Sequence, residues 1–508
     1  MSHFKRLLAF FAMLALLAAC SPKDAAGTAG ATGSETKKTV LRLPATTTFA
    51  TTDPHYTAQN SDYLLNDLLY ESFYYIDNRG NADPRLATSY EVSEDGTVYT
   101  YHLKEGVKWQ TGGTLTSDDV IYSINRALES PYTSSYLAGM EEVTAPDSNT
   151  VVFKLSGMSP TFHINLCRVY ILSKAATEGL DTGFANAYPG GTGPFSIKEW
   201  LPDQKVTVVR NNDYHGKPGS VEEMSFPVLA DTIASLRAFE AGEIDLTQVL
   251  ANDWERIKSN DKYKTSLQES TSVVFVTMNN QQAPFDNALV RQAVNYAIDK
   301  QDMLDAAVNG NGRPQSTIGN YEMVFGIPKP GEIFEYSFDL EKAKSLLAQA
   351  GYPDGLTLDT PIYTLASDEF AIPAQVLQSQ LANAGIKAEI QTVEQSALIS
   401  DYITGNYGIG IIALSMDLDA SIFAVPYSTD GIDGLNIARY SNSIVDESFI
   451  KAGQTLDENE RKEFFKTAFD QASRDAAYAP LYSMQIPLAM DKGLYADIDK
   501  SYYYWGWN

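Results

Sequence analysis

Apolar and polar positions follow two different periods along the chain, which predicts interleaved helices and strands. Apolar residues recur at helical spacing in the segments 63–73, 120–128, 231–240, 287–298, 340–350 and 372–384. Alternation typical of strands marks 39–44, 87–92, 97–103, 143–155, 195–200, 204–211, 271–279 and 386–393. Because the two kinds of segment keep interleaving, we predict an α/β fold with sheets covered by helices.

Local turn and cap signals set several of these boundaries. Asp95-Gly96 predicts a hairpin between the strands 87–92 and 97–103. Thr116, followed three positions later by Asp119, is typical of a capping box and predicts the start of the helix at 120. The run 190–194, with three glycines and a proline, breaks the chain, and Gly351 ends the helix 340–350.

The first 38 residues indicate export and anchoring rather than a folded domain. Lys5 and Arg6 precede an apolar run of residues 7–17, which is too short to span a bilayer. The residues before Cys20 resemble a bacterial lipobox, which implies cleavage before Cys20, acylation of that cysteine with a chain such as palmitate, and anchoring to the membrane. Residues 21–38 are rich in Gly, Ala, Ser and Thr and predict a flexible tether. We therefore expect a body held at the extracytoplasmic face of the bacterial cell membrane.

Length and charge narrow the class of protein further. A chain of 508 residues is too long for one core, so two or three domains are expected. The formal net charge of −26 argues against nucleic acid or anionic lipid as partners. Cys167 is the only cysteine besides Cys20, so an intramolecular disulfide is excluded once Cys20 carries lipid, and we expect Cys167 to be a buried, inert thiol.

A series of sequence blocks follows in order along the chain. These blocks are 53–55, 93–109, 113–120, 191–195, 210–218, 241–245, 284–286, 290–293, 297–299 and 343–355. In this order they resemble the oligopeptide- and dipeptide-binding receptors of ABC importers, the family 5 extracellular solute-binding proteins. The resemblance covers about residues 40 to 485 and is more specific for family and fold than for ligand.

The resemblance implies a two-lobed α/β receptor of the type II periplasmic-binding-protein kind, with a hinge and an extra domain inserted in lobe one. Lobe one would comprise 39–73, 187–273 and 483–508, the inserted domain 74–186, and lobe two 274–482. The crossings at 190–194 and near 271–278 would form the hinge.

A receptor for peptides of varied sequence must hold the features that all peptides share. A carboxylate can bind the terminal ammonium, a strand can pair with the peptide backbone, and wet pockets can accept varied side chains. The family's amine-binding aspartate lies in a segment that often reads Trp-x-x-Asp-x-x-x-Pro, and the corresponding run here is 413–423. The resemblance therefore implies Asp417 as the ammonium anchor, with Asp419 as runner-up. Main-chain pairing would come from Leu414, Ser415 and Met416.

This chain departs from the family pattern, because Leu414 replaces the tryptophan and the proline is missing. Ala58, Gln59 and Asn60 would face the anchor from lobe one, where family members often carry a carboxylate. Tyr482 either lines the cleft or packs in a core. Arg439 is a candidate partner for the peptide carboxylate or one member of a surface ion pair.

The chain shows no catalytic pattern, so we do not expect an enzyme. It lacks a Gly-x-Ser-x-Gly elbow, a Walker loop and a His-Glu-x-x-His helix, and no metal ligand spacing or cofactor is predicted. The predicted partners are a peptide ligand and the permease subunits of an ABC importer, and we expect a monomer. The alternatives are another solute on the same scaffold, such as an oligosaccharide, an opine, haem or a metal chelate, and a receptor that senses peptides without feeding an importer.

Overall fold

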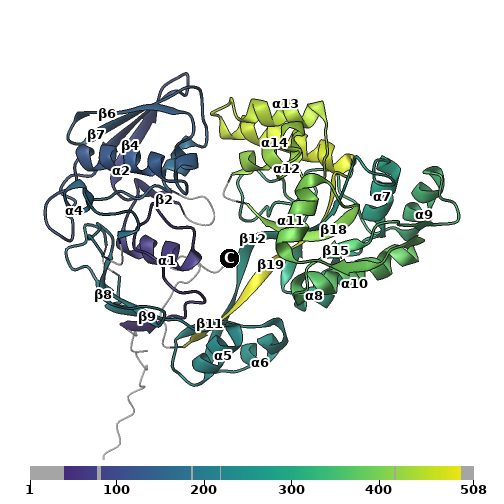
Figure 1. Ribbon diagram of the computed structural model, residues 1–508, viewed down its shortest axis with the longest axis horizontal. Helices are drawn as coiled ribbons and strands as arrows, with labels where there is room; N and C mark the ends of the chain where they lie inside the picture. Colours follow the sequence, from purple (N-terminus) through teal and green to yellow (C-terminus); the bar gives the residue numbers. More distant parts are fainter. Residues whose placement is uncertain (1–38, 77–81, 185–186, 218, 417–418, 493–508) are drawn as a thin grey trace, which may run out of the picture. The chain divides into compact units, whose positions relative to one another are not determined.

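The structure, a computed structural model, describes residues 39–76, 82–184, 187–217, 219–416 and 419–492 (Figure 1). The predicted signal peptide, Cys20 and the tether lie outside these residues. Within them, no helix is both long and apolar enough to cross a bilayer.

An antiparallel sheet with one covering helix makes up much of the predicted inserted domain. Its strands, in spatial order, are β4 (Ala87–Val92), β5 (Val98–Leu103), β7 (Thr150–Leu155) and β6 (Met140–Asp147). Helix α2 (Ser117–Glu129) packs Val120 and Ile124 into the same core as Tyr101 and Phe153. The smaller elements nearby in sequence are β2 (Tyr74–Ile76), β3 (Ala82–Pro84), α3 (Phe162–Leu166) and α4 (Lys174–Thr177).

The predicted capping box at the start of α2 is confirmed. The backbone N–H of Thr116 donates to Asp119 Oδ2 at 2.9 Å, and the reciprocal bond is also present. The predicted burial of Cys167 is confirmed as well. The thiol is buried, and burial raises its pKa to about 12, so it stays protonated and unreactive.

A second sheet carries the predicted lobe-one core. Its strands, in order, are β1 (Val40–Arg42), β10 (Glu223–Pro227), β9 (Lys205–Arg210) and β8 (Phe195–Leu201). Helix α1 (Asn60–Leu69) buries Leu65, Leu68 and Leu69 in the core that also holds Val208 and Phe226. Two short helices follow, α5 (Thr232–Glu240) and α6 (Trp254–Lys258).

The largest sheet links segments from the two predicted lobes. Its order is β11 (Leu246–Gln248), β19 (Tyr478–Asp491), β12 (Tyr263–Met278), β18 (Ile409–Ser415), β15 (Ile362–Thr364) and β17 (Ile390–Thr392), and β13 (Gly312–Pro314) also pairs with β19. The antiparallel pairing of β12 with β19 is interrupted between Glu269 and Val273. This irregularity falls at the start of the predicted hinge segment 271–278, whose hinge role stays a prediction, as do the domain boundaries.

Helices cover both faces of this sheet in the predicted lobe two. One core joins Val274 and Val276 of β12 to α7 (Ala288–Ala297), α8 (Lys300–Val308), α9 (Leu340–Gln349) and α10 (Asp368–Asn383). The opposite core joins Phe275 to α12 (Ala424–Tyr427), α13 (Ser443–Ala452) and α14 (Glu458–Arg474). Consecutive residues of one strand therefore face different cores, as the pleat requires.

Several predicted elements differ from the observed ones. The helix expected at 63–73 runs from Asn60 to Leu69 and stops where Tyr70 becomes extended, and the strand expected at 271–279 begins at Tyr263. The helix expected at 372–384 begins at Asp368, with Asp368 and Glu369 in its first turn, where carboxylates complement the helix dipole. The strand expected at 386–393 is two short strands, β16 (Ile386–Lys387) and β17. They are separate because β16 pairs with β14 (Leu356–Thr357), whereas β17 pairs with β15.

The glycine run at 190–194 lies in close contact with the end of α1. Gly193 N donates to Leu69 O at 3.0 Å, and a Cβ on Gly191 would lie 1.9 Å from that same carbonyl oxygen. The absence of side chains is therefore required for packing at this chain crossing.

We expect Gly191→Ala to lower the free energy of unfolding by about 1–3 kcal/mol, because the methyl group would push the backbone of α1 away. Urea denaturation measures the change. Gly157→Ala is the matched control, since a Cβ there meets no atom within 4 Å. Equal stabilities of the Gly191 variant and the parent protein would contradict this account of the crossing.

Candidate functional site

The second half of β18 has one strand edge without a partner among the described residues. Residues Ile409–Ser415 all pair with β12, whereas β15 pairs only with Ile409 and Gly410. Leu414 and Ser415 therefore lie where backbone N–H and C=O groups on one side remain open to a further strand. Leu414 is half-buried, Ser415 is exposed, and Met416 is buried beneath the strand end.

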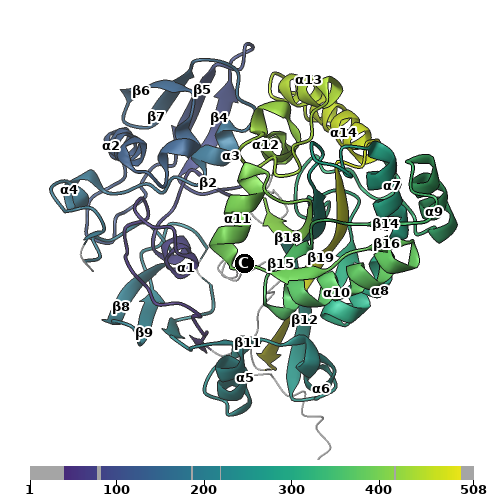
Figure 2. The ribbon, with the colours of Figure 1, turned by 45° about the vertical axis from the view of Figure 1, so that its right-hand side comes forward.

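An apolar cavity lies beside this open edge. Its lining comes from β18, from α11 (Gln395–Thr404) and from the loops before α10 and α13, and it includes Ile412 and Leu414. Helix α11 and β18 lie next to each other in both ribbon views (Figure 2). Leu414 was predicted as a ligand contact, whereas the α11 residues were not predicted. The exposure of Ile399 on α11 is unusual for a large apolar residue, but exposure cannot be inferred from sequence alone.

Of the two aspartates predicted to bind the ammonium group, only Asp419 belongs to the described residues. Asp417 lies outside the described residues. Asp419 forms a buried ion pair with Arg461, at 2.8 Å between Oδ1 and Nη2, and the same oxygen accepts a bond from Ser421 N at 2.9 Å. The charge of Asp419 is thus already balanced within the protein, which leaves Asp417 as the better candidate for an incoming ammonium.

The predicted lobe-one residues Ala58, Gln59 and Asn60 are exposed at the N-terminus of α1. A chain of hydrogen bonds positions this turn. Gln59 N donates to Thr57 Oγ1 at 3.1 Å, and Thr57 Oγ1 donates to Asp62 Oδ2 at 2.7 Å. Burial raises the pKa of Asp62, while the bond from Thr57 opposes that rise. These hydrogen bonds therefore hold the backbone of the turn that carries the three residues.

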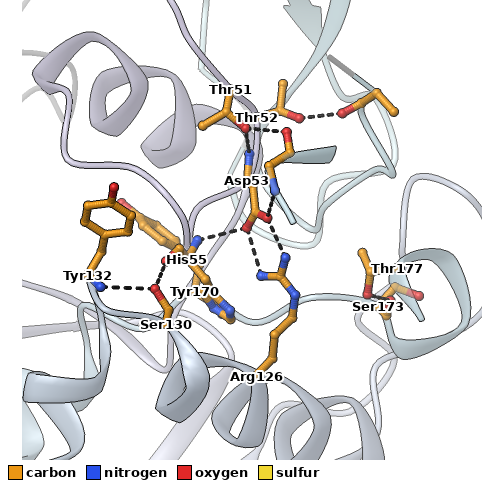
Figure 3. A network of polar contacts seen from close by, with 12 residues as sticks. Thr51, Thr52, Asp53, His55, Arg126, Ser130, Tyr132, Tyr170, Ser173 and Thr177 are labelled. Atoms are coloured by element: carbon orange, nitrogen blue, oxygen red, sulfur yellow. Dashed lines mark hydrogen bonds and ion pairs between the residues drawn. The ribbon is translucent and has the colours of Figure 1, made fainter. Parts of the chain in front are cut away.

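The chain before this turn is held by a buried ion pair that the sequence analysis did not predict (Figure 3). Asp53 is fully buried and accepts from Arg126 Nη1 at 2.8 Å, from Gly183 N at 2.8 Å and from His55 N at 3.1 Å. Arg126 belongs to α2, so the pair joins the predicted inserted domain to the segment that leads to Ala58.

His55 beside this pair is a neutral structural residue. Its Nε2–H donates to the carbonyl oxygen of Tyr170 at 2.8 Å, which fixes the tautomer. Burial, assisted by the positive charge of Arg126, lowers the pKa of His55 to about 4. The imidazole consequently stays uncharged at neutral pH and adds no second cation to the site.

The last two predicted residues, Tyr482 and Arg439, both interact with other parts of the protein. Tyr482 on β19 is fully buried in the core with α7 to α10, and burial raises the pKa of its hydroxyl. Arg439 forms an ion pair with Asp433 at 2.8 Å and donates to Gln281 Oε1 at 3.0 Å. These placements correspond to the core and surface ion-pair interpretations of the sequence. The described residues also include no cluster of three His, Cys, Asp or Glu side chains that could hold a metal ion.

Comparison with known proteins identifies a family of solute-binding proteins and two of its relatives. A model of the family described as bacterial extracellular solute-binding proteins, family 5 Middle, matches residues 81–433. Heme-binding protein A of Haemophilus influenzae is 29% identical over 79% of this chain and 79% of its own length. The oligopeptide-binding protein AppA of Bacillus subtilis is 26% identical over 86% of this chain and 85% of its own.

Solved structures agree with the predicted fold class. The ABC transporter substrate-binding protein CtaP of Listeria monocytogenes superposes with a TM-score of 0.79 at 24% identity, covering 90% of this chain and 94% of that one. The structural neighbours are two-lobed periplasmic binding proteins, which confirms the predicted two-lobed α/β fold.

Proposed function

The chain belongs to the family 5 extracellular solute-binding proteins of bacteria, and on that basis we propose that it captures peptides and delivers them to an ABC importer. The observation that carries the peptide assignment is the open edge of β18 beyond Gly410. An extended peptide can add to such an edge as a further strand, so that binding uses backbone groups common to all sequences.

A cationic terminus requires a nearby negative group, and we assign this role to Asp417. Asp417 stands two residues after Ser415, the last residue of β18, and this short sequence distance supports its assignment to an ammonium group at one end of the added strand. Asp419 is less suited, because Arg461 balances its charge. Leu414, Ser415 and Met416 then supply main-chain pairing, and Ala58, Gln59 and Asn60 contact the ligand from lobe one.

The placement of the protein outside the cytoplasm agrees with its family. The lipobox-like sequence at Cys20 supports the further proposal of a lipid anchor, with the tether 21–38 spacing the body from the membrane. Such an anchor would keep the receptor near the permease subunits that it supplies. A receptor that only senses peptides would bind the same ligands without transport.

The test is mass spectrometry of the molecules that co-purify with the protein and with Asp417→Ala. We expect peptides from the parent protein and at least a tenfold loss from the variant, since a charge-assisted bond to a desolvated ammonium is removed. Asp419→Ala is unsuitable as a control because it breaks a buried pair, so Glu255→Ala, at an exposed ion pair with Lys258, serves instead. Unchanged loading of Asp417→Ala would refute the anchor.

The same measurement decides the main alternative. Heme-binding protein A is about as similar in sequence to this chain as the oligopeptide-binding protein AppA is. Recovery of a tetrapyrrole, a glycan or a metal chelate in place of peptides would therefore refute the peptide assignment and leave the solute-binding function intact.

A further inference from the structure

We propose that the apolar cavity beside β18 receives one large uncharged side chain of the bound peptide, so that this receptor selects peptides with an aromatic or bulky aliphatic residue. The inference rests on the proposed peptide binding and adds a side-chain preference to it. It differs from the expectation of wet, permissive pockets, because the chemistry of this cavity does not suit water.

Among the described residues that line the cavity, none has a charged side chain, and only Ser367 and Gln395 contribute polar side-chain groups apart from tyrosine hydroxyls. Those hydroxyls are already used. Tyr478 donates to Pro426 O at 2.7 Å, and the Tyr402 hydroxyl lies 3.4 Å from the carbonyl oxygens of Tyr363 and Ile411. An ordered water needs two to four polar partners, so most of this space favours an apolar occupant.

The size of the cavity excludes a role as a mere packing defect. Its volume is about 390 Å³. An engineered cavity of about 150 Å³ already holds benzene, and ligand pockets begin at about 300 Å³. The space therefore accommodates a phenyl or indole group with part of the adjoining backbone.

The position of the cavity connects it to the proposed ligand strand. Ile412 and Leu414 of β18 both line it and pack in the same core, so they share one face of the strand. A peptide paired with this edge would direct every second side chain toward that face.

The rim of the cavity is exposed and apolar, as an entrance for an apolar group requires. Ile399 on α11 is 41% exposed and Leu435 in the loop before α13 is 46% exposed. They come from separate elements, and both line the cavity. Large apolar residues grouped at a cavity rim are typical of binding sites.

The experiment is isothermal titration calorimetry with peptides of equal length that carry Ala, Leu, Phe, Trp, Glu or Lys at each position in turn. At one position, we expect Phe or Trp to bind at least tenfold more tightly than Ala, which corresponds to burial of one large apolar side chain. Glu and Lys at that position should bind no better than Ala.

Two variants test the assignment to this cavity. Ile399→Asp and Leu435→Asp each place a charge at the rim and should reduce the aromatic preference to less than threefold, with little change for the Ala peptide. Ile450→Asp is the matched control, because Ile450 on α13 is 58% exposed and does not line the cavity. Circular dichroism and thermal melting verify that all three variants are folded.

The outcomes separate the two proposals. If peptides bind but aromatic and alanine members differ by less than threefold at every position, the cavity proposal is overturned and peptide binding stands. An aromatic preference that survives both rim variants also overturns it. If no peptide binds to the parent protein, the proposed function fails, and the cavity proposal fails with it.

Discussion

Replacing Arg126 with alanine is expected to lower the free energy of unfolding by about 3–5 kcal/mol, because it leaves the carboxylate of Asp53 buried without its cation. Asp53 is fully buried, and only 11% of the Arg126 side chain is exposed. The guanidinium also lies over the rings of Tyr56 and Phe184, at 4.9 and 5.0 Å, so the variant loses these contacts too.

Urea denaturation followed by circular dichroism measures this change, with Lys198→Ala as the control. Lys198 pairs with Glu223 at 2.6 Å, but 55% of its side chain is exposed, so its loss should change stability by less than about 1 kcal/mol. A change in the free energy of unfolding below about 1 kcal/mol for Arg126→Ala would show that other groups stabilise the buried carboxylate of Asp53 in the variant. The turn at Ala58–Asn60 depends on the same segment, so peptide affinity of the folded variant should also fall.

Elements with local signals were the ones that the sequence predicted well. The capping box of Thr116 and Asp119 and the turn at Asp95-Gly96 each lie within a few residues of the boundary that they specify. The first half of β12 was missed because residues 263–269 are largely polar. They are in a strand because they pair with β19, more than 200 residues later.

Helix α14 was not predicted, although its sequence contains a usable signal. Its buried positions are 461, 465, 468, 469 and 472, which follow helical spacing. The first of these is Arg461, and a charged residue there obscures the apolar pattern. Its burial is compensated by the ion pair with Asp419, by a bond from Nε to the carbonyl oxygen of Ala452 and by two aromatic rings, none of which the sequence reveals.

The candidate site was predictable in part. The segment that forms β18 could be found from the family pattern, so Leu414 and its neighbours were identified. The apolar cavity could not, because its lining extends from Phe275 to Tyr478 and comes together only in the folded chain. Likewise, the family pattern ranks Asp417 above Asp419, but the sequence does not reveal that Asp419 is paired with Arg461.

Asp67 on α1 gives the protein a pH-dependent stability that should be measurable. The residue is partly exposed, but its carboxyl group is enclosed and accepts a short hydrogen bond from Tyr170 Oη. Burial raises the pKa of Asp67 from 3.8 to about 7, against the opposing effects of the Tyr170 bond and of Arg85. Between these two values the folded state holds a proton that the unfolded state has released.

The stabilisation that the proton on Asp67 gives to the folded state is therefore fully present below pH 4. As the pH rises to 7 this stabilisation is lost, and the free energy of unfolding falls by about 4 kcal/mol for a pKa shift of this size. Asp67→Asn removes the titrating group but can still accept from Tyr170. The variant and the parent protein should have similar free energies of unfolding at pH 4, and the variant should be more stable by about 4 kcal/mol at pH 8. Urea denaturation across this range gives the difference directly.

Asp95→Asn is the contrasting control, because hydrogen bonds from Ser93 and Thr97 lower the pKa of this exposed carboxyl group. A lowered pKa stabilises the folded state above the unfolded value, so this variant should lose stability relative to the parent as the pH rises from 3 to 5. The two aspartates thus predict pH dependences of opposite sign. A stability difference for Asp67→Asn that stays constant from pH 4 to 8 would mean that this carboxyl group is ionised throughout, and that the Tyr170 hydrogen bond and the charge of Arg85 outweigh its burial.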